Sequence, residues 1–140
     1  MDRQIELAWA AGIIDGEGSI FISKQAGVRR KTPAYQAVIK VAMSHKETIE
    51  YIASLFPGSI TTQQRGTNRP MYMVQATSTK ALGIIESLLP FLVTKKKQAR
   101  LVLLWDKYRQ KGKGGPKNTL SESEVNRSEY YRATVSSFNL

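Results

Sequence analysis

Polar and apolar residues alternate along two stretches of the chain, residues 18–46 and 51–85, and neither stretch contains an Asp or Glu. Each stretch predicts a pair of strands, because the alternation has a period near two and turn residues separate the runs. The four runs are SIFISKQ, YQAVIKVAM, SITTQQR and PMYMVQAT. They predict an antiparallel four-stranded sheet with one face on a core and the other in solvent.

The same alternation assigns side chains to the two faces of the sheet. The inward positions are apolar: Ile20, Ile22, Tyr35, Ile39, Val41 and Met43. The outward positions are Ser19, Phe21, Ser23, Gln25, Gln36, Val38 and Lys40, and we expect Thr61, Gln63 and Arg65 to continue this outer face. A face that offers Gln, Lys, Arg, Ser and Thr without a carboxylate suits the DNA major groove, where such side chains contact base edges and phosphates. A merely solvated face explains the pattern equally well.

Helical patterns flank the strand pairs. The first predicted helix is ELAWAAGIIDG near the N-terminus. A capping box at residues 44–47, with the Ser44 hydroxyl as cap, opens the second. Three more are predicted over residues 79–89, residues 95–109 and residues 121 to about 135. The order predicts an α+β fold, αββαββα with additional C-terminal helices. We expect a single domain over residues 1–140, with its core in about 4–110 and a C-terminal linker and helix in 111–140. The glycines of the linker KGKGGPKN do not form a phosphate loop, because they lie between helices.

Charge narrows the class of partner. The 140 residues carry 21 Lys and Arg against 11 Asp and Glu, a net charge of +10, which favours an anionic polymer. The absence of cysteine excludes disulfides, thiolate zinc sites and cysteine nucleophiles. No signal peptide, transit peptide or membrane span is recognisable, so we expect a soluble intracellular protein of the cytoplasm, nucleoid or an organelle, neither secreted nor membrane-bound.

The first predicted helix carries small residues at helical spacing. Ala8 and Gly12, and likewise Ala11 and Asp15, are four residues apart and form a stripe along which another helix can approach closely. Packing on the chain's own sheet is the alternative. The helix ends in Asp15-Gly16-Glu17-Gly18, where carboxylates meet the negative end of the helix dipole at a cost of about 0.3–1 kcal/mol that a bound cation would reverse.

The run Ala10-Ala11-Gly12-Ile13-Ile14-Asp15-Gly16-Glu17-Gly18 resembles the motif that names the LAGLIDADG homing endonucleases, and the resemblance extends over roughly residues 4–110. It implies that Glu17 and the Gly16 carbonyl bind a divalent metal, Mg²⁺ or a substitute such as Mn²⁺ or Ca²⁺. It also implies that Asp15 is structural. PFLVTKKKQA resembles the segment that holds the family's catalytic-site lysine, which gives Lys95 that role.

Independently, Lys95, Lys96 and Lys97 crowd the first turn of a helix, where cations oppose the dipole and a nearby polyanion would favour them. For Lys96 and Lys97 a solvated basic turn is the alternative. Near Met43, where the family often has a water-ordering residue, the sequence assigns none.

The motif occurs once. Residues 80–86 look similar, but no acid-glycine ending and no further strand pairs follow. The resemblance therefore implies a homodimer that brings two Glu17 side chains together, with interface residues Ala8, Ala11, Gly12 and Asp15.

The sequence thus predicts a metal-dependent, site-specific homing endonuclease that cuts both strands of a long pseudo-palindromic DNA target. An intron RNA maturase or a non-cleaving DNA-binding protein of the same fold is the alternative. A basic ribosome-associated structural protein would explain the charge but not DGEG. The expected DNA contacts are Phe21, Ser23, Gln25, Arg29, Arg30, Lys31, Gln36, Lys40, Thr61, Gln63, Arg65, Arg69, Met73, Gln75, Lys96 and Lys97.

Overall fold

The computed structural model describes residues 2–25, 32–64, 69–109 and 120–139. Within them the chain forms the predicted α+β order, and most boundaries lie within a residue or two of those expected. The elements are α1 (Arg3–Glu17), β1 (Gly18–Gln25), β2 (Ala34–Met43), α2 (Lys46–Leu55), β3 (Ile60–Gln64), β4 (Met71–Thr77), α3 (Ser78–Leu88), a short 3₁₀ helix η1 (Leu89–Phe91), α4 (Lys96–Tyr108) and α5 (Glu122–Ser137).

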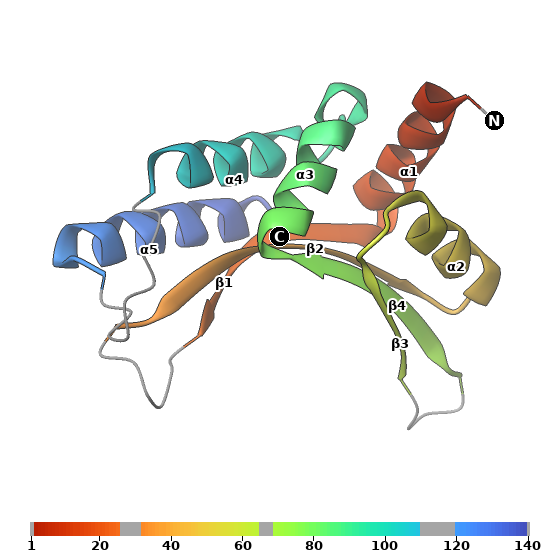
Figure 1. Ribbon diagram of the computed structural model, residues 1–140, viewed down its shortest axis with the longest axis horizontal. Coiled ribbons are helices and arrows are strands. Elements are labelled where there is room, and N and C mark those ends of the chain that lie inside the picture. The colour runs from red at the N-terminus through yellow and green to blue at the C-terminus, as the bar shows by residue number, and fades with distance from the viewer. Residues whose placement is uncertain (1, 26–31, 65–68, 110–119, 140) are drawn as a thin grey trace.

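The sheet has the strand order β1-β2-β4-β3, and all neighbouring strands are antiparallel. Figure 1 shows the helices gathered on one side of this sheet, which arches so that its other face is concave. No helix in the described part of the chain covers that concave face. We call it the outer face. The fold therefore has two layers, with the core between the helices and the convex side of the sheet.

The core contains most of the residues expected to face inward. Ile20, Ile22, Tyr35, Ile39 and Val41 are each at most 8% exposed and belong to one hydrophobic cluster. Met43 is half-buried and packs against this cluster. Helices α3, α4 and α5 complete it; their fully buried contributions include Ile85, Leu88, Val102, Trp105 and Val135. Among the described residues, no helix is long and apolar enough to cross a membrane.

The expected facing of β3 is wrong. Directly opposed residues of an antiparallel pair share a face, and Thr61 pairs with the buried Val74, while Gln63 pairs with Tyr72. Thr61 and Gln63 therefore lie on the helix side of the sheet, and Ile60, Thr62 and Gln64 lie on the outer face. All residues of this edge strand are exposed, so burial leaves no alternation in its sequence that could reveal the register. Arg65 lies outside the described residues.

The cap of α2 also differs from expectation. His45, and not Ser44, is the N-cap, and its Nδ1 accepts a hydrogen bond from the Thr48 N–H at 3.3 Å. Glu47 lies beside the same ring, with 3.4 Å between its carboxylate and Nε2. Ser121 caps α5, accepting from the Glu124 N–H at 3.2 Å.

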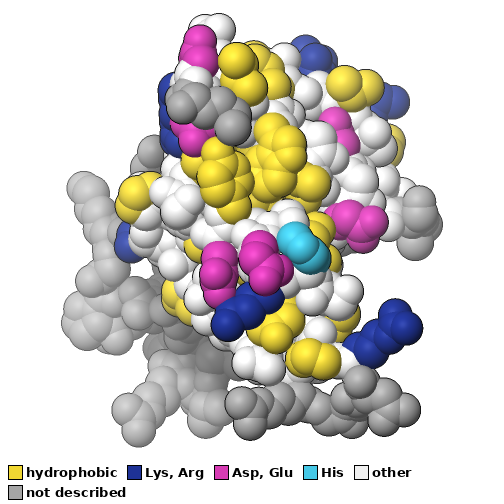
Figure 2. All heavy atoms as spheres, turned by 90° about the vertical axis from the view of Figure 1, so that its right-hand side faces the viewer, with side chains coloured by type: hydrophobic (Ala, Val, Ile, Leu, Met, Phe, Trp, Pro, Cys, Tyr) yellow, Lys and Arg dark blue, Asp and Glu magenta, His cyan; other side chains and the backbone are white. Residues whose placement is uncertain are grey.

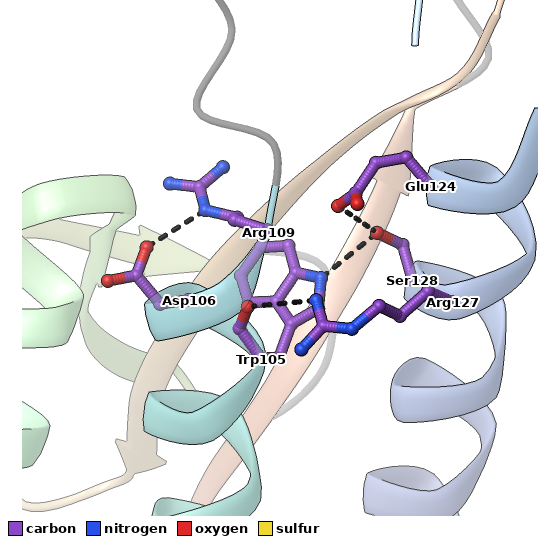
Figure 3. Close-up of polar contacts among 6 residues, drawn as sticks. All are labelled: Trp105, Asp106, Arg109, Glu124, Arg127 and Ser128. Atoms are coloured by element: carbon purple, nitrogen blue, oxygen red, sulfur yellow. Dashed lines mark hydrogen bonds and ion pairs between the residues drawn. The ribbon is translucent and has the colours of Figure 1, made fainter. Parts of the chain in front are cut away.

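Helix α5 is joined to α4 by a buried polar contact (Figure 3). The indole N–H of Trp105 donates to the Ser128 hydroxyl at 3.0 Å, and both residues are at most 1% exposed. Arg127 of α5 donates to the Trp105 carbonyl at 3.5 Å. Because Val135 of the same helix lies in the main core, α5 is part of the sheet-covering layer.

We expect Ser128→Ala to lower the free energy of unfolding by about 1–3 kcal/mol, because the buried indole donor would lose its acceptor. Urea unfolding followed by Trp fluorescence measures this loss. Ser136→Ala, on an exposed position of the same helix, is the matched control and should change stability little. An equal effect of both variants would contradict the assigned contact.

A second polar group fixes α5 to the sheet. Lys24 Nζ lies 2.6 Å from the Glu129 carboxylate, and the Tyr35 hydroxyl donates to it at 2.8 Å. The hydrogen bond from Lys24, and then that from Tyr35, hold the pKa of Glu129 below its usual value of 4.5. Burial, and then the bond to Glu129, raise the pKa of Tyr35 to about 12.

These shifts set the pH dependence of folding. A lowered carboxyl pKa gives stability that is present above the ordinary value of 4.5 and is lost as pH falls through the folded value. The raised tyrosine pKa gives stability that is present below 10 and is lost as pH rises toward about 12. Glu129→Gln should therefore flatten the acid limb of a plot of unfolding free energy against pH, whereas Glu122→Gln, which has no such partners, should leave it unchanged.

Candidate active site and nucleic-acid interface

The end of α1 passes into β1 without a loop. Gly18 is at once the C-cap of the helix and the first residue of the strand, and its N–H donates to the Ile14 carbonyl. A Cβ at Gly18 would lie 2.9 Å from the Ile14 Cα, so the glycine permits this close approach. The junction fixes Glu17, which is exposed, at the point where the helix meets the sheet.

The other acid of the motif is held by the chain itself. The Asp15 carboxylate accepts the backbone N–H groups of Val93 and Lys95 at 2.8 and 3.0 Å, in the connection between η1 and α4. Lys95 Nζ donates to the Asp15 carbonyl at 2.9 Å. These donors compensate for the negative end of the helix dipole at Asp15. They also bring Lys95, which is far from the motif in sequence, to the end of α1 that carries Glu17.

Glu17 and the Gly16 carbonyl offer hard oxygen ligands of the kind that Mg²⁺ and Ca²⁺ prefer. In the described residues no three Asp, Glu, His or Cys side chains come together as a metal cluster. The donor set of one chain therefore fits a divalent ion that keeps water and takes its remaining ligands from elsewhere, as Mg²⁺ does when it binds through one or two carboxylates and a phosphate.

The three lysines at the start of α4 differ in burial and in contacts. Lys95 is the N-cap, half-buried and bound to Asp15, and Lys96 is half-buried in the first turn. Lys97 is exposed, with its ammonium 5.3 Å from the Phe138 ring centroid.

The stripe of small residues on α1 divides between two faces of the helix. Ala8, Gly12 and Gly16 are exposed, and a Cβ added at either glycine would meet nothing within 4 Å. Ala11 is fully buried in the chain's own core, and Asp15 turns to the η1–α4 connection. Ala11 therefore offers no surface to a partner, because its own chain covers it, whereas Asp15 is half-buried and its place in a dimer interface stays a prediction.

Beside the exposed stripe lies an apolar surface formed by α1 and α2, on the side of the molecule seen in Figure 2. Ile5 is 58%, Trp9 38% and Tyr51 36% exposed. The rings of Trp9 and Tyr51 pack edge to face with their centroids 5.1 Å apart. The Tyr51 hydroxyl also donates to Glu6 at 3.1 Å. This surface was not predicted from the sequence, although Ile5 and Trp9 each lie three residues before a member of the small-residue stripe, Ala8 and Gly12.

Most expected DNA contacts on β1, β2 and β4 share the outer face. The strand register aligns Ser23 with Gln36, and Lys40 with Gln75. On the same face lie Phe21, Gln25 and Met73. Lys40 Nζ lies 5.3 Å from the Phe21 ring centroid.

Val38, on the outer face, is only 5% exposed although it lies outside the main core cluster. Arg69 is exposed just before β4, and Arg29, Arg30 and Lys31 lie outside the described residues.

Two further features of the outer face escaped the sequence analysis. Thr62 and Gln64 take the places expected for Thr61 and Gln63. Ser78, the first residue of α3, reaches Gln36, and its hydroxyl donates to Gln36 Oε1 at 3.0 Å. Ser78 also lines a hollow of about 360 Å³ together with Gln75, Thr77, Thr79 and Lys80.

Comparison with known proteins agrees with this geometry. The family model described as LAGLIDADG endonuclease matches residues 10–108, from the motif helix through α4. The chain belongs to the LAGLIDADG endonuclease family. No curated protein sequence matches it significantly.

Solved structures of homing endonucleases share the fold. I-CvuI bound to its target in the presence of calcium superposes with a TM-score of 0.79 at 21% identity, covering 97% of this chain and 83% of that one. The archaeal intron-encoded enzyme I-Vdi141I, complexed with DNA, gives 0.75 at 15% identity, covering 98% and 86%. I-SmaMI bound to cleaved DNA gives 0.66 at 18% identity, covering 96% of this chain and 43% of that one. The αββαββα arrangement with additional C-terminal helices, expected from the sequence, is confirmed.

Proposed function

We propose that this protein is a site-specific homing endonuclease that hydrolyses both strands of a DNA duplex in the presence of Mg²⁺. The observation that carries the proposal is the end of α1, where the exposed Glu17 lies at the helix-to-strand junction and Asp15 binds Lys95 beside it. This helix continues directly into β1 of a sheet whose outer face is concave and whose strands contain no carboxylate. DNA-bound relatives of the same fold support DNA as the substrate.

Glu17 and the Gly16 carbonyl would hold the divalent ion, which supplies an activated water and charge stabilisation at the scissile phosphate. The protein's own part is positional. Gly18 fixes the carboxylate against the sheet, and Asp15 fixes the backbone at Lys95. The Lys95 ammonium, held at the Asp15 carbonyl, would stabilise negative charge on the phosphate.

Two copies of the chain are needed in this proposal, since one chain offers one metal-binding carboxylate and a duplex has two strands to cut. Ala8, Gly12 and Gly16 would form the contact between the two α1 helices. The neighbouring Trp9 and Tyr51 would extend it. We also propose that residues 1–140 act as one domain, because Ser128 and Val135 of α5 are buried with the rest of the chain.

The outer face would lie in the major groove. Its proposed contacts in the described residues are Phe21, Ser23, Gln25, Gln36, Lys40, Thr62, Gln64, Arg69, Met73 and Gln75, with Lys96 and Lys97 near the cut phosphates. Direct reading of bases requires side chains on this face, so Thr61 and Gln63 are left out of the set.

The test is incubation of the protein with a randomised duplex library and Mg²⁺, followed by sequencing of cut ends. We expect enriched double-strand cleavage at related sites, abolished by EDTA. Binding of selected sequences without cleavage would instead indicate a non-cleaving DNA-binding protein. Absence of both, together with binding to structured intron RNA, would indicate a maturase.

A further inference from the structure

We propose that Ser78 is a positioning residue for base recognition, which orients the Gln36 amide so that its N–H donors face the major groove. The inference rests on the proposed function, because it assumes that the outer face reads DNA. It assigns to a residue of the β4–α3 junction a share of the specificity carried by β2.

One hydrogen bond holds the Gln36 side chain, and a second holds its backbone. Ser78 donates its hydroxyl to Gln36 Oε1 at 3.0 Å. The Ser23 hydroxyl donates to the backbone carbonyl of Gln36 at 3.5 Å, and Ser23 is the direct cross-strand neighbour of Gln36. Gln36 is half-buried, and the strand register places it on the outer face of the sheet.

In the structure, Oε1 of the Gln36 amide is the atom that faces the Ser78 hydroxyl. A glutamine carries an acceptor and two donors on one planar group, so a half-turn exchanges them. With Oε1 bound to Ser78, the amino group points away from Ser78. Donors suit the N7 and O6 acceptors of guanine and oppose the N4 amino group of cytosine. We therefore expect Gln36 to favour guanine and to reject cytosine on the strand that it contacts.

The backbone at Ser78 supports a role beyond local folding. Ser78 has φ of 56°, in the left-handed region, and is the one non-glycine residue with positive φ in the described part of the chain. Such a conformation costs a serine free energy that a glycine would avoid. The serine does not supply a helix cap either, since the N-cap of α3 is Thr77, which has no side-chain capping bond. The hydroxyl bond to Gln36 is the gain that a serine offers here and a glycine lacks.

The test compares base preferences of four proteins in a binding selection from a randomised duplex library with Ca²⁺ in place of Mg²⁺: wild type, Ser78→Gly, Gln36→Ala and the double variant. Ser78→Gly removes the hydroxyl but suits the positive φ, so folding should be unharmed or improved. Thr79→Ala, which removes a neighbouring exposed hydroxyl, is the matched control.

Gln36→Ala should identify the base pair that Gln36 reads by loss of preference there. At that base pair Ser78→Gly should reduce the preference for guanine over cytosine by about tenfold, within the range expected for one good base contact. The double variant should be no less selective than Gln36→Ala alone. Thr79→Ala should keep the wild-type preference.

If Ser78→Gly retains wild-type selectivity, the inference is overturned and the proposed function stands. The same holds if the wild type prefers cytosine at the base pair identified by Gln36→Ala. An unchanged preference profile in Gln36→Ala would overturn it as well. If the wild type itself selects no sequence, the proposed function fails, and the two failures are thereby distinguished.

Discussion

Glu17→Gln should abolish double-strand cleavage while leaving folding and DNA binding intact. The amide keeps the size of the side chain but loses the charge that would hold the metal ion. Loss of several kcal/mol of transition-state stabilisation corresponds to a rate reduction of roughly a hundredfold or more. Because Glu17 is exposed and Asp15, not Glu17, carries the bonds to the η1–α4 connection, the fold should not suffer.

The measurement is single-turnover cleavage of a selected site by saturating protein, with binding followed separately by fluorescence anisotropy. Glu86→Gln, the same change on an exposed position of α3, is the control and should cleave like wild type. Full cleavage by the Glu17 variant would remove this residue from the site. An equal loss in both variants would point to a general charge effect.

Gly12→Leu should yield a folded monomer that no longer cuts both strands. A Cβ at Gly12 meets nothing within 4 Å in its own chain, so a single subunit accommodates the larger side chain. Replacing a helical glycine by leucine even favours the helix by about 0.8 kcal/mol or slightly less. Between two α1 helices, however, the branched side chain would cause overpacking, typically worth about 1–3 kcal/mol. Symmetry would introduce it twice.

Gly83→Leu provides the matched control. Gly83 is also exposed in the middle of a helix, and a Cβ there likewise meets nothing within 4 Å, but Gly83 belongs to α3 and not to the small-residue stripe of α1. Sedimentation velocity should detect monomers for Gly12→Leu and dimers for Gly83→Leu and wild type, with thermal melting undiminished in both variants. A cutting, dimeric Gly12→Leu protein would exclude this stripe as the contact.

The sequence predicts the elements well where one face of an element is buried. In β1 and β2 the alternation is visible because Ile20, Ile22, Ile39 and Val41 must be apolar. Strand β3 has no buried residue, so the pattern of polar and apolar residues along it does not indicate which side faces the helices. Its register follows only from pairing with β4.

The candidate site likewise contains residues that the sequence predicts and contacts that only the fold creates. The motif identifies Glu17, and the resemblance identifies Lys95, but only the fold brings the backbone of Lys95 to Asp15. Ala8 and Ala11 are chemically identical, and the spacing of small residues cannot tell which one faces solvent. Ser78 escaped because its importance depends on a backbone conformation and on a partner 42 positions away, neither of which leaves a local pattern.

The loop-free passage from α1 to β1 has a consequence for where such a protein would cut. Because Gly18 belongs to helix and strand at once, no loop separates Glu17 from the residues of β1. The number of base pairs between the recognised bases and the broken bond is then set by the chain and does not depend on the target sequence. Variants that read new bases through Ser23 or Gln25 should therefore cut their new targets at the old spacing.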